Sequence, residues 1–217
     1  MALASGFEPV NVERIADELW RWSAFHEEWK EEVGCVYYEG SDAVCLIDPL
    51  VPAVEKARFF AALDRDVRRV GRPVHVLVTV YWHTRSARDL AGRYGAEVWA
   101  PSRARKAVER RAGKARAFRP GDPLPGGIVA FQTARSNEVV LFLPEHRALV
   151  TGDVILGAEG GGLRLCPASW LPEGVGQDEL RASLRPLLEL PVERVLVSHG
   201  EAVLERGHGA LERLLVG

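Results

Sequence analysis

The apolar positions of this chain fall into short continuous runs and into longer stretches with helical spacing. The clearest run lies between Val74 and Val80, where five of the seven residues are valine or leucine. Such a near-continuous run is typical of a β-strand that is buried on both faces. A polar loop with His83, Thr84 and Arg85 follows it. Because loops at the carboxyl ends of central strands often carry functional residues, this loop is the first candidate site.

The same two patterns predict the other elements. Ser86, followed by Asp89 three residues later, resembles a capping box and predicts the start of a helix. Four glycines within 157–162 predict a mobile loop at the rim of a site. Strands are predicted within 8–24 and over 33–39, 43–48, 74–80, 97–100, 128–132, 138–143, 148–151 and 192–197, and helices over 53–70, 86–94, 101–111, 177–188 and 209–216.

Composition limits the class of protein. The 217 residues contain no linker-like stretch, so we expect one α/β (α+β) domain over 1–217. A net charge of −2 predicts no general attraction to nucleic acid or membranes, and the basic helix over 101–111 is interpreted as a solvated face. The chain shows no signal sequence and no apolar run near the roughly 20 residues of a membrane span, so a cytoplasmic location is expected.

The three cysteines do not form a disulfide framework, because their number is odd and none are closely paired. Cys35 and Cys45 lie in apolar, alternating segments. Free cysteines in such segments usually behave as small buried apolar residues. We therefore predict that they are buried, reduced thiols.

Three further stretches complete a family pattern with the 74–90 segment. They read Ala-Val-Cys-Leu-Ile-Asp-Pro over 43–49, Val-Thr-Gly-Asp-Val over 150–154 and Val-Leu-Val-Ser-His-Gly over 195–200. In order and spacing, these pieces resemble the metallo-β-lactamase superfamily from about residue 33 to the C-terminus. The resemblance implies a four-layer αββα sandwich. It also implies a hydrolase with two metal ions, in which Asp153 bridges the ions and His199 closes the site.

The motif that supplies most of that family's metal ligands is changed here. If Thr79 is aligned with the threonine that precedes the family's His-x-His-x-Asp-His, the four ligand positions fall on Val80, Trp82, Thr84 and Arg85. The next family histidine would fall near residue 134, where the sequence has alanine. Asp153 and His199 remain, and two ligands are too few to bind zinc tightly.

Our leading interpretation is a divergent member of that superfamily with a degraded metal site. Such a protein would bind a small molecule or a partner, with little or no metal-dependent hydrolysis. Arg85 would pair with Asp153 and replace the lost metal charge, since an unpaired buried carboxylate is unfavourable. The pocket would consist of Arg85, Thr84, Trp82 and Asp48, with Trp82 filling the volume of the missing ions.

A second interpretation keeps one metal ion. A register shift of one residue would place His83 at the second histidine position of the motif. His83, Asp153 and His199 would then be both the metal ligands and the catalytic residues. Two histidines and one carboxylate suit a single Zn, Fe or Mn ion. The implied activity is hydrolysis of an ester, a thioester or a similar bond in a small molecule.

The third interpretation is a non-catalytic interaction or oligomerisation protein. Trp20, Trp22 and Trp29 make the N-terminal segment rich in tryptophan, and they could mediate an interaction with another protein or the formation of a homo-oligomer.

Overall fold

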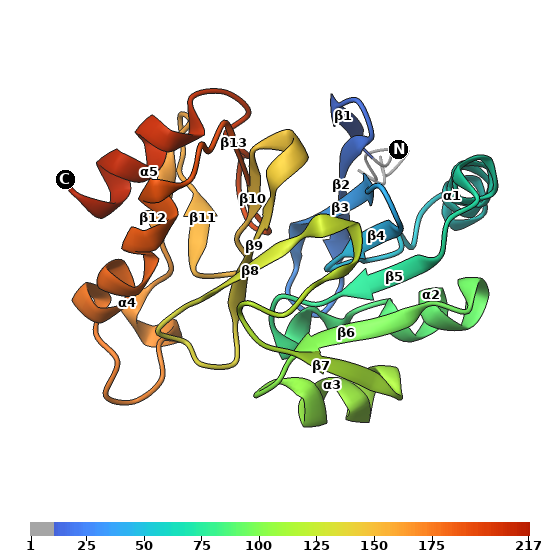
Figure 1. Cartoon of the computed structure of the whole chain (residues 1–217), viewed down its shortest axis with the longest axis horizontal. Coiled ribbons are helices and arrows are strands. Elements are labelled where there is room, and N and C mark those ends of the chain that lie inside the picture. Colours follow the sequence, from blue (N-terminus) through green and yellow to red (C-terminus); the bar gives the residue numbers. More distant parts are fainter. Residues whose placement is uncertain (1–10) are drawn as a thin grey trace, which may run out of the picture.

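A computed structural model of the chain describes residues 11–217. Residues 8–10 of the first predicted strand, and the start of the chain where a signal sequence would lie, are outside this range. Two sheets account for most of the strands, and their order explains where the candidate loops meet (Figure 1).

The larger sheet has seven strands in the order of the chain, from β1 to β7. The first four strands pair antiparallel, and β4 to β7 pair parallel. The parallel strands are short, and the residues of β4 are all buried. The strands are β1 (Val12–Ala16), β2 (Leu19–His26), β3 (Glu31–Glu39), β4 (Val44–Ile47), β5 (Val74–Leu77), β6 (Glu97–Pro101) and β7 (Ala115–Phe118).

The smaller sheet has four strands in the order β13-β10-β9-β8, and a separate hairpin pairs β11 with β12. Its strands are β8 (Val129–Gln132), β9 (Val139–Leu143), β10 (Ala148–Val150) and β13 (Arg194–Leu196), and the hairpin consists of β11 (Ile155–Gly157) and β12 (Leu163–Leu165). The helices are α1 (Lys56–Val70), α2 (Ala87–Tyr94), α3 (Arg105–Ala112), α4 (Gln177–Leu184) and α5 (Gly207–Leu215).

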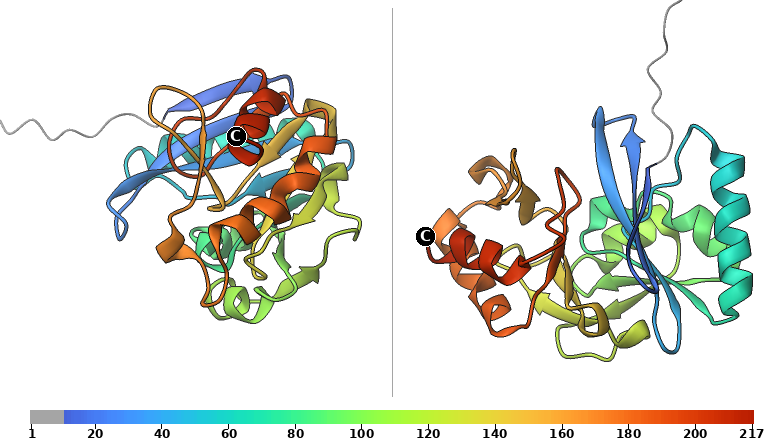
Figure 2. Two further views of the ribbon diagram at one scale, coloured as in Figure 1. Left: turned by 90° about the vertical axis from the view of Figure 1, so that its left-hand side faces the viewer. Right: turned by 90° about the horizontal axis from the view of Figure 1, so that it is seen from above.

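Three hydrophobic clusters show that the molecule has four layers. One cluster lies between the two sheets and includes Tyr38, Ile47 and Leu141. A second joins the larger sheet to α1, α2 and α3, and a third joins the smaller sheet to α4 and α5. The two halves of the chain therefore form opposite sides of the sandwich (Figure 2). The predicted αββα architecture is confirmed.

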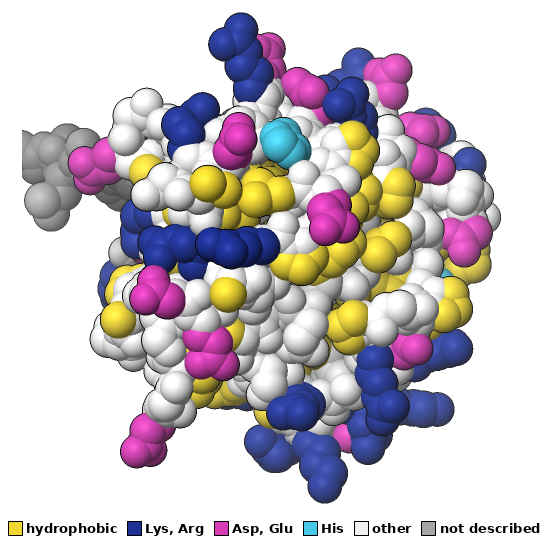
Figure 3. All heavy atoms as spheres, turned by 60° about the vertical axis from the view of Figure 1, so that its left-hand side comes forward, with side chains coloured by type: hydrophobic (Ala, Val, Ile, Leu, Met, Phe, Trp, Pro, Cys, Tyr) yellow, Lys and Arg dark blue, Asp and Glu magenta, His cyan; other side chains and the backbone are white. Residues whose placement is uncertain are grey.

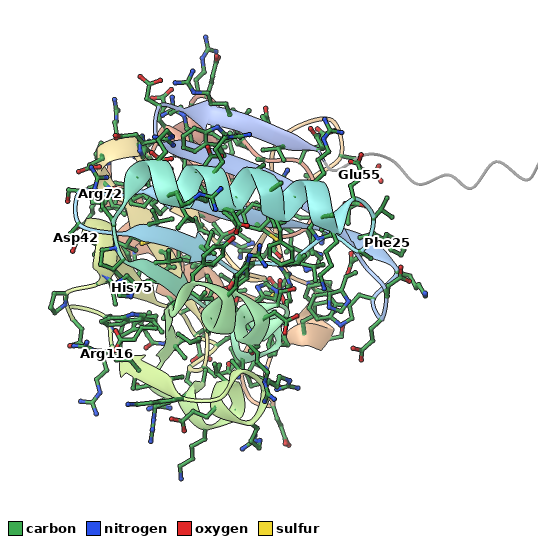
Figure 4. The ribbon with its side chains drawn as sticks, turned by 90° about the vertical axis from the view of Figure 1, so that its right-hand side faces the viewer. Phe25, Asp42, Glu55, Arg72, His75 and Arg116 are labelled. Atoms are coloured by element: carbon green, nitrogen blue, oxygen red, sulfur yellow. The ribbon has the colours of Figure 1, made fainter. Side chains whose placement is uncertain are left out.

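The parallel strands all run toward one end of the sandwich. In Figure 4, Asp42, Arg72 and His75 lie at the end of the sheet where β4 and β5 begin, and Phe25 and Glu55 lie at the opposite end. The loops that follow β4 and β5 therefore meet the turn between β2 and β3. This end holds the candidate site.

Several details differ from the sequence-based predictions. β7 was not predicted, because Ala115–Phe118 is too short and too polar to show alternation. The glycine-rich segment predicted as a loop forms the turn of the β11–β12 hairpin. Ser86 lies at the N-cap of α2, but its side chain makes no capping bond. Instead its Oγ accepts a hydrogen bond from Val51 N at 2.9 Å, so it fixes the loop after β4.

Basic side chains are clustered in one region of the surface. Lys and Arg side chains gather at the lower edge of the face drawn in Figure 3, the level at which α3 and β7 lie in Figure 1.

All three cysteines are buried and free, as predicted. Trp22 is buried and donates to Leu50 O at 2.9 Å, so it belongs to the core and not to a contact surface. Within 11–217, no helix combines the length and hydrophobicity of a membrane-spanning segment.

Gly157 tests how tightly the site loop is packed. A Cβ at this position would lie 2.4 Å from the backbone N and O of Glu201, while Gly157 N donates to His199 O at 2.9 Å. Gly157→Ala should therefore lower the free energy of unfolding by about 1–3 kcal/mol, measured by urea denaturation. Gly92→Ala is the control, because Gly92 lies in α2 with open space around it. It should raise stability by about 0.5–1 kcal/mol. Equal effects at both positions would contradict this packing.

Candidate functional site

The candidate site is built from four chain segments at one end of the sandwich. His83 lies in a single 3-10 turn, Tyr81–Thr84, directly after β5. Asp153 follows β10, and His199 follows β13. Parallel pairing of β10 with β13 brings the last two loops together. The turn between β2 and β3 contributes Trp29, and Glu31 is the first residue of β3.

His83 lies between two carboxylates. Its side chain has no exposed surface; its Nδ1 lies 2.9 Å from Asp48 Oδ2, and its Nε2 lies 3.0 Å from Asp153 Oδ1. Burial and the charge of Arg85 oppose protonation of the ring, but the charges of Asp153 and Asp48 outweigh them and raise the pKa of His83 to about 8. His83, one of the three residues of the mononuclear interpretation, therefore lies against the carboxylate of Asp153.

Asp48 fixes the orientation of His83. Its Oδ1 accepts a hydrogen bond from Thr79 N at 2.8 Å, and its Oδ2 accepts one from Thr79 Oγ1 at 2.5 Å. Because Asp48 is buried, water does not compete with its carboxylate for Thr79 or His83. Asp48 has a positive φ of 49°, which turns the chain sharply at the end of β4.

Asp153 is the centre of the cluster. Its Oδ1 lies 3.1 Å from His199 Nε2 as well as 3.0 Å from His83 Nε2, and its Oδ2 accepts a hydrogen bond from Trp82 Nε1 at 2.6 Å. Burial opposes ionisation of this carboxyl, but the charge of His83 and the contacts from His199 hold its pKa well below the usual range. Asp153 is therefore ionised at neutral pH.

Glu31 is the carboxylate that faces the outer nitrogen of His199. His199 Nδ1 lies 3.2 Å from Glu31 Oε2, a carboxylate that is half exposed at the turn between β2 and β3. The rings of Trp29 and Trp170 lie 6.0 and 6.1 Å from the His199 ring, centroid to centroid. These rings shield the imidazole from solvent without bonding to its nitrogens.

Arg85 does not pair with Asp153, contrary to the interpretation from sequence. Its Nη1 donates to Asp48 O at 2.9 Å and to Gly34 O at 3.3 Å, and its Nη2 donates to Ser198 Oγ at 2.8 Å. Arg85 thus joins three loops of the site. Its backbone φ of 32° is in a region that is unfavourable for arginine. These hydrogen bonds hold that conformation.

A cavity of about 440 Å³ opens beside the cluster. Of the four predicted pocket residues, Trp82 borders it. Thr84 is buried and bonds to Tyr81 O, while Asp48 and Arg85 support the site from behind. The lining residues are Trp29, Glu31, Trp82, Arg135, Asp153, Trp170 and His199.

Glu138 was missed by sequence analysis, although it shapes the site. Its Oε1 accepts hydrogen bonds from Asp153 N at 2.6 Å and Val154 N at 3.0 Å. Gly152 makes this approach feasible, because a Cβ there would lie 2.6 Å from Glu138 Oε1. Burial and the charge of Asp153 raise the pKa of Glu138, while Arg135 opposes them. A glutamate at the start of an apolar strand gave no signal of this role.

Nearly the whole chain matches a known family. The sequence profile of the metallo-β-lactamase superfamily matches residues 13–217. The chain belongs to this superfamily. No curated protein matches it.

Solved metallo-β-lactamases share the fold. The enzyme from Pontibacter korlensis has a TM-score of 0.70 and 14% identity, covering 96% of this chain and 98% of its own. FIM-1 from Pseudomonas aeruginosa, in its mono-zinc form, has a TM-score of 0.68 and 13% identity, covering 96% and 95%. The enzyme from Hirschia baltica has a TM-score of 0.65 and 14% identity, covering 93% and 94%. Identities this low show the fold alone.

The residues of this metallo-β-lactamase-like site fit one divalent metal ion. Ligand atoms of His83, Asp153 and His199 all lie within 4.8 Å of one another. Among residues 11–217, the buried His83 Nε2 and Asp153 Oδ1 have no hydrogen-bond partner with good geometry, which is unusual for buried polar atoms. The second nitrogen of each imidazole faces a carboxylate, as is common for metal-bound histidine.

Asp48→Asn tests the anchor of His83. The substitution removes a buried charge that accepts two hydrogen bonds from Thr79 and faces His83. It should lower the free energy of unfolding by about 1.5–3 kcal/mol in urea denaturation. Asp89→Asn is the matched control, because Asp89 is exposed on α2, and it should change stability by less than about 0.5 kcal/mol. A wild-type value for Asp48→Asn would contradict the anchoring role.

Proposed function

We propose that the chain is a hydrolase with one divalent metal ion held by His83, Asp153 and His199, acting on an ester, a thioester or a similar bond in a small molecule. The observation that carries this proposal is the arrangement around the three donors. Each has one atom turned toward the common point and a second atom close to a neighbour. Asp48 Oδ2 lies 2.9 Å from His83 Nδ1, Trp82 Nε1 donates to Asp153 Oδ2, and Glu31 Oε2 lies 3.2 Å from His199 Nδ1 without a well-formed hydrogen bond.

A three-residue donor set suits catalysis more than structure. Structural zinc sites are usually closed by four protein ligands, whereas catalytic sites keep a position open for water or substrate. Two imidazoles and one carboxylate suit Zn, Fe or Mn. When bound, such an ion supplies a Lewis acid and a water with a lowered pKa.

The chain's own residues would prepare the site for that chemistry. Asp48 holds the His83 ring by its Nδ1, which leaves Nε2 turned toward Asp153. Trp82 donates to one oxygen of Asp153 and leaves the other toward the imidazoles. Trp29 and Trp170 border the cavity, where their rings exclude water from one side of His199 and form an apolar wall for substrate.

A second candidate function is metal-free binding of a small molecule on the same scaffold. It is favoured by the position of His83, which contacts a carboxylate with each ring nitrogen. A protonated His83 would then supply the positive charge that the interpretation from sequence assigned to Arg85. In this case the cavity binds a ligand, and little or no metal-dependent hydrolysis follows.

Metal content separates the two candidates. Protein expressed with zinc, iron and manganese and then desalted should retain about one equivalent of metal in elemental analysis, because three protein ligands suffice for a catalytic site. Asp153→Asn should lose it, together with any turnover of ester and thioester substrates. Asp178→Asn, a fully exposed aspartate on α4, is the control and should keep both. Metal-free wild-type protein would favour the second candidate and overturn the first.

A further inference from the structure

Arg135 is a buried cation that neither candidate function uses. It lies in the loop between β8 and β9, and its side chain is 6% exposed. The guanidinium carbon lies 4.6 Å over the ring of Trp82, and Nη1 lies 2.9 Å from Glu138 Oε2. Stacking on an indole holds the planar group in one orientation. Arg135 also borders the 440 Å³ cavity.

The donors of Arg135 are largely unused. A guanidinium carries five N–H donors. Within residues 11–217, no hydrogen bond joins this group to another residue, and the buried Nη1 has no partner with good geometry although Glu138 is near. Buried polar groups in proteins nearly always have a partner. Nη1 lies against Glu138, and Arg135 also borders the cavity, so a ligand there is the available partner for the donors that Glu138 leaves free.

The charge of Glu138 does not replace such a ligand. Its Oε1 is already shared between Asp153 N and Val154 N. The single contact at Oε2 occupies one edge of the guanidinium and leaves the rest of the fork free. A planar fork of this kind matches the two oxygens of a carboxylate or two oxygens of a phosphate.

The rest of the cavity suits an apolar group. Trp29 and Trp170 border it together with Trp82, and Trp170 is 41% exposed at the rim. Aromatic side chains provide a large, rigid contact area for a planar or branched apolar body. The polar contacts for such a ligand are confined to Arg135 on one side and to the Asp153–His199 cluster on the other.

We propose that Arg135 is the anion-binding residue of this cavity and that its ligand is a small molecule with a carboxylate or a phosphate on an apolar body. This inference deepens the proposed function, because it defines the substrate class of the same site. That the ligand is a substrate rests on the proposed function. Anion binding itself does not need the metal ion. A purely structural Arg135, present only to neutralise Glu138, would leave the cavity without preference for charge.

The test compares a charged probe with its neutral counterpart. Full-length protein, as isolated and after treatment with a chelator, is titrated with sodium benzoate, benzamide or inorganic phosphate at constant ionic strength, and binding is followed by calorimetry and by the shift in Tm. Benzoate should bind saturably and at least about tenfold more tightly than benzamide, since a bidentate charged contact is lost in the amide. Comparison with phosphate distinguishes the two anion types.

A double variant keeps the test valid if a single change unfolds the protein. Arg135→Met alone would leave Glu138 buried without its cation, so Arg135→Met is combined with Glu138→Gln, whose side-chain oxygen can still accept from Asp153 N and Val154 N. The double variant should lose the preference for benzoate over benzamide. Arg181→Met on α4 is the control and should keep it.

Three results would overturn the proposal: equal binding of benzoate and benzamide, no binding of either benzoate or phosphate, or unchanged preference in the double variant. Comparing the protein before and after chelator treatment distinguishes failure of the anion-binding proposal from failure of the proposed hydrolase function. Anion binding without retained metal would support Arg135 and reject the mononuclear hydrolase. Retained metal with turnover of neutral esters only would support the mononuclear hydrolase and reject the role of Arg135.

Discussion

The buried carboxylate of Asp153 is the charge around which the rest of this site is arranged. Removing a carboxylate from water is unfavourable unless hydrogen bonds and positive charge compensate for it. Here the compensation comes from Trp82, His83 and His199, which together approach both oxygens. Glu138 holds the backbone of the same residue. Each of these groups is constrained in turn by a partner farther from the cavity.

The constraints also join the two halves of the sandwich. Asp48 and His83 belong to loops of the larger sheet, whereas Asp153 and His199 follow strands of the smaller one. Arg85 adds a second connection, because it donates to the backbone of Gly34 on one side and to Ser198 on the other. The geometry of the site therefore depends on how the two sheets pack, and the sheet-to-sheet core is part of its support.

Much of the fold could be predicted from sequence, because strands such as β4 and β5 are apolar at nearly every position and their loops carry a recognisable family order. The strands β7, β11 and β12 could not, since none of them contains a continuous apolar run of four residues. The site was predictable where a motif survives, as at Asp153 and His199. His83 was found only as an alternative, because it stands beside a motif position and not on it. Arg135, Glu138 and Glu31 had no local signal; only the tertiary fold brings them to the cavity.

The hydrogen bond from Trp82 to Asp153 has a consequence for the two oxygens of that carboxylate. Here one oxygen faces the imidazoles and the other is occupied by the indole N–H. The guanidinium of Arg135 lies over the same indole, so a fixed positive charge already stands beside this carboxylate. Trp82 therefore both uses one oxygen of Asp153 and carries a cation on its face, and a substitution at position 82 would change the hydrogen bonding and the electrostatics of the cluster together.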